Sequence, residues 1–464
     1  MPKLDPSTDE FRAAGHRLID WIADYFQNID SYDVLSRVQP GDIAKQFADR
    51  ASEDGKPYDA LFAEFEEKII PGITHWNHPS FFAYFSVTGS QAGVLGELLT
   101  AALNTQGMLW KTSPSMTELE IVALGWLRDA MGLPSNLFGI INDTASINVF
   151  LALAAAREAL GLDIRRKGMT GRDLPPLKIY CSEHAHSSVD KAALALGFGQ
   201  SGIVKIPADE HFRMRPDALA DAIEKDRKDG ALPCAVVATT GTTSTAAVDP
   251  VRAVAEIAKG ENCWLHVDAA YAGPAAICRE FRWIFDGIER ADSIVTNPHK
   301  WFFTQIDCSI LYTSRPDVLR ETFSLVPEYL KTTDTAEVNF MDYGLSLGRR
   351  FRALKLWMVM EHYGLERIRS VIREQVGFAE RLAAELRRRD GVEVLSQSFS
   401  VVTFRLKAGD EATMALMEKM NATGKLFVSH TKLRGQVVIR VAIGNGATEW
   451  RHVKQIVEQI LTSP

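Results

Sequence analysis

The sequence predicts an α/β protein built on a mostly parallel, seven-stranded sheet with helices on both faces. Between residues 138 and 313, seven short apolar runs occur, and several are separated by helical stretches such as FLALAAAREAL. This alternation is typical of strands buried on both faces of a parallel sheet. The chain has 464 residues, 46% of them apolar, which is enough for a large core. The seven runs are FGIIN, LKIYC, GIVKI, CAVVAT, CWLHV, DSIVT and CSILYT.

The N-terminal region is expected to form a helical arm. Apolar side chains in residues 9–27 recur at helical spacing, a second helix is expected after VQPGD, and DALFAEFEEKIIPGI continues the pattern. Roughly the first 75 residues therefore lack a core of their own and must pack on another surface, such as that of a second subunit. The apolar positions in the first helix are Phe11, Leu18, Trp21, Ile22, Tyr25 and Phe26.

The C-terminal region predicts a small α+β domain. The helix GFAERLAAELRRRD precedes the alternating runs VEVLSQ, VVTFRLK and VVIRVAIG, and the helix EWRHVKQIVEQILT follows them. We therefore divide the chain into an N-terminal arm (1–80), a large domain (81–370) and a small C-terminal domain (371–464).

Composition excludes several classes of function. The formal charge of −7 and the lack of long Lys/Arg runs argue against nucleic-acid binding. No apolar segment has the length of a signal peptide core or a membrane span, so no membrane partner and a cytoplasmic location are expected. The cysteines are scattered without a CxxC pair, which predicts buried, reduced thiols and neither a disulfide framework nor a metal site. They are Cys181, Cys234, Cys263, Cys278 and Cys308.

Suggestive polar residues follow several of the predicted strands, where open α/β sheets bind ligands. Thr144, Ala145 and Ser146 follow the first run and open a helix. Their hydroxyl and N–H groups could hold a phosphate, although an ordinary helix cap is the alternative. His186 follows another run, in HAHSSVDKA.

Two further strand ends provide an acid and an amine. Asp268 ends the run CWLHVD, where burial of an unpaired carboxylate is costly and a protonated heterocyclic nitrogen would be a partner. Lys300 follows Asn-Pro-His in DSIVTNPHKWF, and a buried lysine can lose its proton and form an imine with an aldehyde. Phosphate cradle, acid and lysine together describe a pyridoxal 5'-phosphate site. No glycine-rich nucleotide motif competes for the phosphate.

Six motifs, occurring in order over nearly the whole chain, resemble those of the group II pyridoxal phosphate decarboxylases, in particular the aromatic L-amino acid decarboxylases. They are HPSFFAYF, TSPSMTELE, HAHSSVDKA, HVDAAYAG, NPHKW and LGRRFRALKLW. The resemblance implies the fold type I architecture and an obligate homodimer with active sites at the subunit interface, where the N-terminal arms embrace the partner. It also implies that the substrate is a small molecule, an aromatic L-amino acid, which is decarboxylated to the amine and CO2; the protein would then be a carbon–carbon lyase.

The resemblance also assigns roles to residues. Lys300 would hold the cofactor as an imine, Asp268 would pair with its pyridinium nitrogen, and Ala270 and His186 would cover the two ring faces. The expected phosphate neighbours are Thr144, Ala145, Ser146, Asn297 and His299, and Thr242 is a further expected cofactor contact. The expected substrate pocket comprises Tyr84, Phe85, Val87, Gln106 and Met108.

Four residues depart from the family pattern. Asp143 stands where the family usually has glycine before the phosphate-binding residues. Gln106 and Met108 stand where animal members place an isoleucine and a phenylalanine, and Val87 replaces a threonine that can contact catechol hydroxyls. A catechol substrate is therefore disfavoured, whereas phenylalanine, tyrosine and tryptophan all remain open.

A fifth departure concerns the product. Family decarboxylases carry a loop tyrosine ten residues before the second arginine of LGRRFR, and that position is Phe340 here. The tyrosine returns a proton to Cα, and relatives with phenylalanine act as aldehyde synthases that release aldehyde, ammonia and hydrogen peroxide. Tyr343, three residues on, is an alternative proton donor. We predict the amine as the main product and keep the aldehyde as the alternative.

Two other classes of function remain to be distinguished. An aminotransferase would share the lysine and the aspartate, and Arg440 in VVIRVAIGN resembles the arginine with which such enzymes bind the substrate carboxylate. The six motifs favour a decarboxylase. An interaction module without catalysis is disfavoured because the cofactor motifs are all present.

Overall fold

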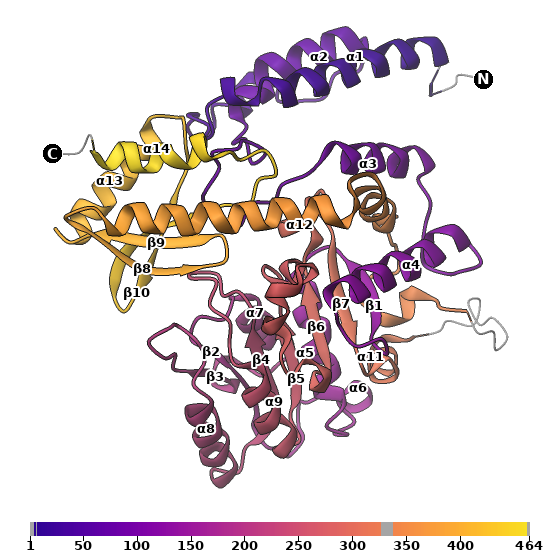
Figure 1. The fold of residues 1–464 in the computed structure, drawn as a ribbon. Coiled ribbons are helices and arrows are strands. Elements are labelled where there is room, and N and C mark those ends of the chain that lie inside the picture. Colours follow the sequence, from indigo (N-terminus) through magenta and orange to yellow (C-terminus); the bar gives the residue numbers. More distant parts are fainter. Residues whose placement is uncertain (1–3, 6, 326–336, 462–464) are drawn as a thin grey trace.

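The computed structural model describes residues 4–5, 7–325 and 337–461. Figure 1 shows an arm with α1 and α2 at the top, the large sheet with its helices below, and a smaller sheet beside the long helix α12. Within the described residues, no helix is long and apolar enough to cross a membrane.

The large sheet confirms the predicted architecture. Its strand order is β1-β7-β6-β5-β4-β2-β3, with β7 antiparallel to both of its neighbours and parallel pairing among the other strands. Each of the seven apolar runs forms one strand. The strands are β1 (Phe138–Asn142), β2 (Leu177–Ser182), β3 (Ile203–Ile206), β4 (Leu232–Thr239), β5 (Trp264–Asp268), β6 (Ser293–Thr296) and β7 (Ser309–Thr313).

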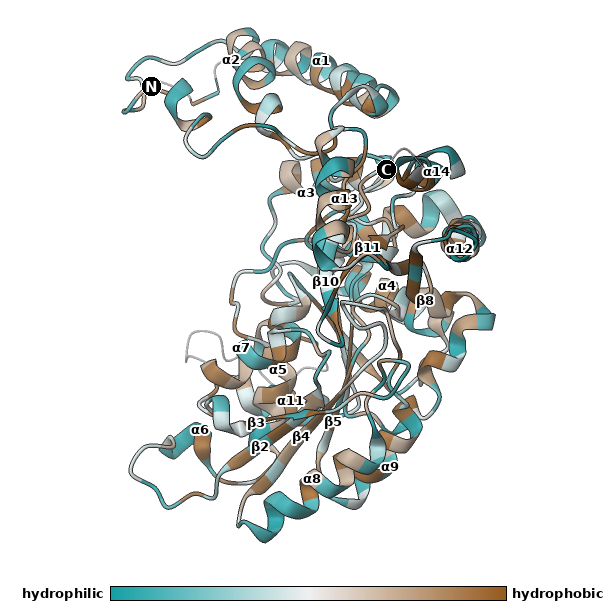
Figure 2. Ribbon diagram, turned by 90° about the vertical axis from the view of Figure 1, so that its left-hand side faces the viewer, coloured by the Kyte–Doolittle hydropathy of each residue, from teal (hydrophilic) through white to brown (hydrophobic). Residues whose placement is uncertain are grey.

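Helices cover both faces of this sheet, and Figure 2 shows hydrophobic strands beside a largely hydrophilic α8 at the surface. Alternate residues of β5 enter two different cores: Leu265 and Val267 pack on one side, and Trp264 on the other. Asp268 therefore shares the side of Trp264. Helix α3 (Gln91–Leu103) packs on α12 instead. The other helices of this region are α4 (Pro114–Met131), α5 (Ala145–Glu158), α6 (Ile164–Lys167), α7 (Ser188–Ala195), α8 (Pro216–Lys228), α9 (Val251–Gly260), α10 (Pro298–Trp301) and α11 (Pro316–Phe323).

The small sheet is antiparallel, in the order β10-β11-β9-β8. Its core also receives the second half of α12. The sequence prediction missed β10, because its exposed and half-buried residues lack a clear apolar alternation. Arg434 and Gly435, both with positive φ, form the two-residue turn that pairs β10 with β11. The elements are α12 (Arg352–Arg387), β8 (Val392–Ser398), β9 (Val401–Leu406), α13 (Asp410–Ala422), β10 (Ser429–Leu433), β11 (Gln436–Ala442) and α14 (Trp450–Leu461).

Helix α12 runs across the domain boundary that the sequence suggested at residue 370. It bends at Gly364, where φ is 67°. The division into a large and a small domain at that residue therefore stays a prediction.

The arm contains α1 (Thr8–Gln27) and α2 (Tyr58–Glu64). The predicted helix after VQPGD is wrong, because only one short turn, Ala44–Gln46, forms in a segment with few apolar residues. In α1 only Ala14 is buried, whereas Phe11 is exposed. The apolar stripe of the arm is thus only partly covered by its own chain: Phe11 and Leu18 are exposed, whereas its other members are half-buried.

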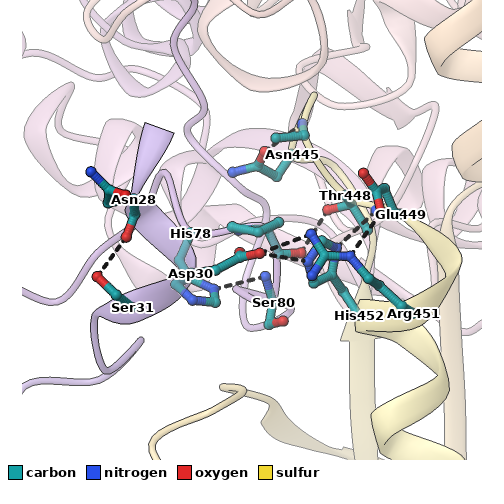
Figure 3. A network of polar contacts seen from close by, with 12 residues as sticks. Asn28, Asp30, Ser31, His78, Ser80, Asn445, Thr448, Glu449, Arg451 and His452 are labelled. Carbon is teal, nitrogen blue, oxygen red and sulfur yellow. Dashed lines mark hydrogen bonds and ion pairs between the residues drawn. The ribbon is translucent and has the colours of Figure 1, made fainter. Parts of the chain in front are cut away.

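A polar network joins the arm to the C-terminal helix (Figure 3). Asp30 accepts a hydrogen bond from Arg451 at 2.9 Å and lies 3.5 Å from Nε2 of His452. The N–H of Glu449 donates to Nδ1 of His452 at 2.9 Å. Because Nδ1 of this histidine accepts a hydrogen bond, the proton of its neutral ring lies on Nε2, where it faces Asp30.

The same region gives a pH prediction. His78 accepts a hydrogen bond from the N–H of Ser80, and burial lowers the pKa of His78 to about 4. The unfolded chain then binds more protons than the folded one between about pH 6.5 and 4, so folding stability falls as the pH falls through that range. We expect His78 to contribute about 1–2 kcal/mol to this loss at pH 5. Melting temperatures at pH 7 and 5 should therefore differ less in His78→Gln than in the wild type.

The solvent-exposed His16 provides the control for this measurement. His16→Gln should keep the acid sensitivity of the wild type. Equal acid sensitivity in all three proteins would assign the effect to other groups.

Candidate active site

A cavity of about 210 Å³ lies at the carboxyl ends of the central strands. It brings together ten of the residues predicted from the sequence: Phe85, Thr144, Ala145, Ser146, His186, Asp268, Ala270, Asn297, His299 and Lys300. Four lining residues were not predicted: Thr239, Gly241, Thr243 and Tyr271. Their only signal was their position at the end of, or just after, the strand run CAVVAT, or within the motif HVDAAYAG.

Lys300 lies on the short helix α10, directly after β6. Burial lowers the pKa of Lys300; the charge of Asp268 opposes this effect and that of Arg440 adds to it. The next residue, Trp301, fixes the backbone, because its indole N–H donates to Gln375 at 2.6 Å and its ring stacks on Tyr271. The result is a well-anchored lysine whose neutral amine is favoured, as a nucleophile requires.

Asp268 presents a buried carboxylate at the end of β5. One oxygen accepts a hydrogen bond from the N–H of Ala270 at 3.0 Å. In the part of the chain that the structure describes, Asp268 forms no ion pair, although only 5% of it is exposed. A protonated ring nitrogen in the cavity would supply the missing positive partner.

His186 follows β2 and is held by the start of α7. Its Nδ1 accepts a hydrogen bond from the N–H of Ser188 at 3.1 Å and lies 2.9 Å from the hydroxyl of that residue. Burial lowers the pKa of His186, while Asp268 opposes the shift. The imidazole is therefore oriented by its own chain, as a flat group that packs on a cofactor ring must be.

The other end of the cavity offers donors for an anion. Thr144 caps α5, whose first-turn N–H groups have no partners within the helix. His299 accepts a hydrogen bond from the N–H of Cys308 through Nδ1, and burial lowers the pKa of His299 to about 3. Its Nε2 is thus a neutral donor. Asp143 accepts a hydrogen bond from the N–H of Thr144 at 2.6 Å, so its carboxylate lies beside this donor group.

These features fit pyridoxal phosphate. The cavity combines an amine, a carboxylate without a cation and a helix N-terminus. The hydroxyl of Thr239, which also lines the cavity, is buried and has no hydrogen-bond partner in the described part of the chain. A bound ligand would give it one.

Arg440 was noted in the sequence only as a feature of an alternative function. The structure buries it against the cavity wall, with its guanidinium 4.5 Å from the ring centroid of Phe85. It donates to the backbone oxygens of Thr243 and Tyr84, at 2.8 and 2.6 Å. Its Nη2 has no partner among the described residues, which leaves a buried cationic donor beside the site.

Several predicted residues do not line this cavity. Thr242 is buried behind it, with its hydroxyl 3.0 Å from that of Thr245. Tyr84 is 54% exposed. The remaining residues outside the lining are Val87, Gln106, Met108, Phe340 and Tyr343.

Phe340 and Tyr343 instead pack on their own chain. Phe340 is 1% exposed and lies between the ring of Phe138 and the guanidinium of Arg349, whose centre is 4.5 Å from the Phe340 centroid. The Tyr343 ring is 4.6 Å from that of Phe138. Both side chains thus lie outside the Lys300 cavity of the same chain.

The segment around Gln106 and Met108 is bound to the segment around Phe340. The side chain of Gln106 accepts a hydrogen bond from the N–H of Arg349 at 2.9 Å, and the backbone oxygen of Met108 accepts one from Met341 at 3.3 Å. We call residues 104–111 and 339–349 together the 106/340 ridge.

Comparisons with known proteins agree with this geometry. The sequence profile of the pyridoxal-dependent decarboxylase conserved domain matches residues 40–407. The chain belongs to the pyridoxal-dependent decarboxylase family. Its cofactor is therefore pyridoxal phosphate, and the architecture is fold type I, as expected.

Plant enzymes are among the similar relatives of this decarboxylase. Tryptophan decarboxylase 2 of Oryza sativa subsp. japonica is 40% identical, over 96% of this chain and 92% of the relative. Phenylacetaldehyde synthase of Arabidopsis thaliana is 39% identical, over 97% and 94%. Among solved structures, that of Catharanthus roseus tryptophan decarboxylase in complex with L-tryptophan superposes with a TM-score of 0.93. The two sequences are 36% identical, and the match covers 99% of this chain and 98% of the other.

Proposed function

We propose that this decarboxylase acts on aromatic L-amino acids of the phenylalanine, tyrosine or tryptophan class and releases CO2 and the amine. The observation that carries the proposal is the convergence of Lys300, Asp268 and His186 on one cavity whose far end offers phosphate donors. The similarity to a tryptophan decarboxylase over nearly the whole chain supports the aromatic substrate class.

Asp268, Lys300 and His186 have different roles in the proposed decarboxylation. Pyridoxal phosphate, when bound, supplies a cationic ring that accepts the electron pair left at Cα when CO2 departs. Asp268 holds a proton on the ring nitrogen and so stabilises the developing charge more in the transition state than in the ground state. Lys300 would provide the amine that attaches the cofactor, and His186 would pack on its ring.

Arg440 is the group best placed to orient the substrate carboxylate. An α-amino acid brings one carboxylate, and the unpartnered Nη2 of Arg440 is a buried donor beside Phe85. A fixed cation at the wall would hold this carboxylate in one orientation and so favour cleavage of its bond to Cα over cleavage of the other bonds at Cα.

Product analysis tests the proposal. The purified protein is incubated with each aromatic L-amino acid, and CO2, amine, aldehyde, ammonia and hydrogen peroxide are measured together. Release of CO2 with stoichiometric amine is the expected result. A keto acid without CO2 would identify an aminotransferase, and a colourless protein that does not react with borohydride would identify a module without catalysis.

A second candidate function is oxygen-dependent aldehyde synthesis. Phe340 at the position of the family's loop tyrosine favours it, as does the 39% identity to a phenylacetaldehyde synthase. A phenyl ring cannot return a proton to Cα, so the carbanionic species would live longer and could be oxidised by O2. The alternative donor is the Tyr343 hydroxyl, and burial raises the pKa of Tyr343.

We expect Phe340→Tyr to move the product ratio toward amine. General-acid catalysis contributes about 10²–10⁴-fold, enough to change the dominant product where no other donor is in place. Oxygen-electrode traces with phenylalanine, tyrosine and tryptophan measure the aldehyde pathway directly, and amine is measured in the same samples. Tyr343→Phe is the companion variant: it should raise oxygen uptake if Tyr343 is the donor. A wild type that takes up no oxygen and yields stoichiometric amine would leave only the decarboxylase.

We further propose a homodimer with shared active sites, in which the 106/340 ridge of one subunit approaches the Lys300 cavity of the other. Supporting this, large apolar side chains of α1, α3 and α4 are exposed in the single chain, more than a monomer normally leaves uncovered. They are Phe11, Leu18, Ile19, Leu95, Leu98, Leu99, Leu103, Ile121, Val122 and Trp126. The five free, buried cysteines are compatible with the cytoplasmic location that we also propose.

The dimer gives a prediction for α3. Leu98→Asp together with Leu99→Asp should shift the protein to a monomer in sedimentation velocity and abolish turnover, because two carboxylates would be buried without partners in the interface. Deleting the first 75 residues should also lower activity. Lys178→Asp, on the large sheet, serves as a surface control and should remain dimeric. A fully active monomeric variant would contradict shared sites.

A further inference from the structure

A chain of side-chain amide and hydroxyl groups, half-buried at Asn142 and buried beyond it, connects β1 to the phosphate end of the cavity. The amide nitrogen of Asn142 donates to Oδ1 of Asn148 at 2.7 Å, and Nδ2 of Asn148 donates to the hydroxyl of Ser309 at 2.7 Å. That hydroxyl donates to Oδ1 of Asn297 at 2.6 Å. Asn148 and Ser309 are fully buried, and Asn297 is 2% exposed.

The chain has a direction. An amide has one accepting and one donating end, so Asn148 must donate to Ser309 once its oxygen accepts from Asn142. Ser309 has a single proton, which it gives to Asn297. The oxygen of the Asn297 amide is thereby occupied, and its NH2 group remains for the cavity that Asn297 lines.

Water is poorly placed to replace a member of this chain. Asn148 lies in α5 next to Val149, which belongs to the hydrophobic core on the Trp264 side of the large sheet. Ser309 is the first residue of β7, whose Leu311 belongs to the same core. A missing partner in such surroundings leaves a buried polar group unsatisfied. From Asn148 to Asn297, the direction is thus passed on by buried side chains alone.

We propose that Asn148 and Ser309 are positioning residues that hold the Asn297 amide with its NH2 group toward the cofactor phosphate. The inference rests on the proposed function, because it takes the anion in the cavity to be the phosphate of pyridoxal phosphate. It extends that function by assigning the orientation of a donor to residues that do not themselves line the cavity.

The variant Asn148→Asp tests the direction of hydrogen-bond donation along this chain, because aspartate has nearly the same size and shape as asparagine. The carboxylate would accept from both Asn142 and Ser309, so the hydroxyl proton would no longer reach Asn297. Asn297 would then gain its hydrogen bond by rotating its amide, which turns its oxygen toward the phosphate. Because hydrogen bonds to charged groups are among the strong ones, we expect affinity for pyridoxal phosphate to fall about 10- to 100-fold.

Binding of pyridoxal, which lacks the phosphate, distinguishes a lost phosphate contact of Asn297 from general disruption of the cofactor site. Its affinity should be nearly the same in wild type and Asn148→Asp, measured by absorbance on reconstituting the full-length protein after cofactor removal. Asn421→Asp, a comparable change in the small domain, is the control and should bind both compounds as the wild type does. Ser309→Ala removes the hydrogen bond to Asn297 without favouring the opposite orientation of its amide. Its affinity for pyridoxal phosphate should fall less than that of Asn148→Asp, and its affinity for pyridoxal should again stay nearly unchanged.

The possible outcomes distinguish a failure of the positioning role from a failure of the proposed function. Equal weakening toward both compounds, or unchanged affinity for pyridoxal phosphate in Asn148→Asp and Ser309→Ala, would overturn the positioning role while leaving the proposed function intact. If Asn148→Asp does not fold, the phosphate selectivity of the loss in Ser309→Ala decides. A wild type that binds neither compound would overturn the proposed function itself.

Discussion

Replacing Lys300 with alanine is expected to abolish turnover and to remove the cofactor adduct that borohydride traps. No other lysine lines the cavity in the described part of the chain. Burial lowers the pKa of Lys300, which favours the neutral, nucleophilic form of its amine more than solvent does for an exposed lysine. Alanine at this position leaves the other cofactor contacts in place, so the variant should still bind pyridoxal phosphate without a covalent bond.

Peptide mass spectrometry after borohydride treatment makes this test specific. In the wild type the reduced cofactor should lie on the peptide that contains Lys300, and in Lys300→Ala no peptide should carry it. Lys178→Ala, a change at a lysine outside the cavity, is the matched control and should retain both label and activity. A label on a different lysine in Lys300→Ala, together with turnover, would refute the assignment.

Asp268→Ala should lower kcat by several orders of magnitude while part of the cofactor remains bound. Without the carboxylate, the ring nitrogen loses the group that keeps it protonated, and the transition state loses its main electrostatic stabilisation. Turnover under saturating cofactor and the absorbance of the bound cofactor measure the two effects separately.

Asp292→Ala is the control for this variant. Asp292 accepts a hydrogen bond from the N–H of Leu265, near the opposite end of β5 from Asp268. Its loss should lower the melting temperature but leave kcat within about tenfold, since it makes no contact with the site. Comparable loss of kcat in both variants would mean that Asp268 acts by supporting the strand, and near-normal turnover in Asp268→Ala would mean that another group protonates the ring.

Much of the large sheet could be predicted because its strands are continuous apolar runs that end in polar residues. Asp268 and Lys300 were identifiable for the same reason: Asp268 directly follows the run CWLHV, and Lys300 comes four residues after the run DSIVT. β10 was missed because it alternates exposed and half-buried polar residues, and its pairing depends on a turn with positive φ at Arg434. Local sequence carries a strong signal only where burial is strong.

Contacts between segments that lie far apart in the chain could not be predicted from the sequence. The hydrogen bond between Asn148 and Ser309 spans 161 positions, and neither residue belongs to a motif that predicts it. Counting from the motif LGRRFR located Phe340 within the loop, but nothing in the sequence shows that its ring packs on Phe138 and Arg349. Motifs identify chemistry, whereas the partner of each side chain follows from the fold.

The burial of Phe340 has a consequence for the stability of the subunit. A tyrosine at this position would have to find a partner for its hydroxyl inside a packed core, and an unsatisfied buried hydroxyl costs about 1–3 kcal/mol. If Phe340 sets the product, as proposed above, Phe340→Tyr would therefore change both the product ratio and the stability of the folded subunit. Such an exchange would leave stability unchanged only where a neighbouring side chain, such as Arg349, could offer the new hydroxyl a hydrogen bond.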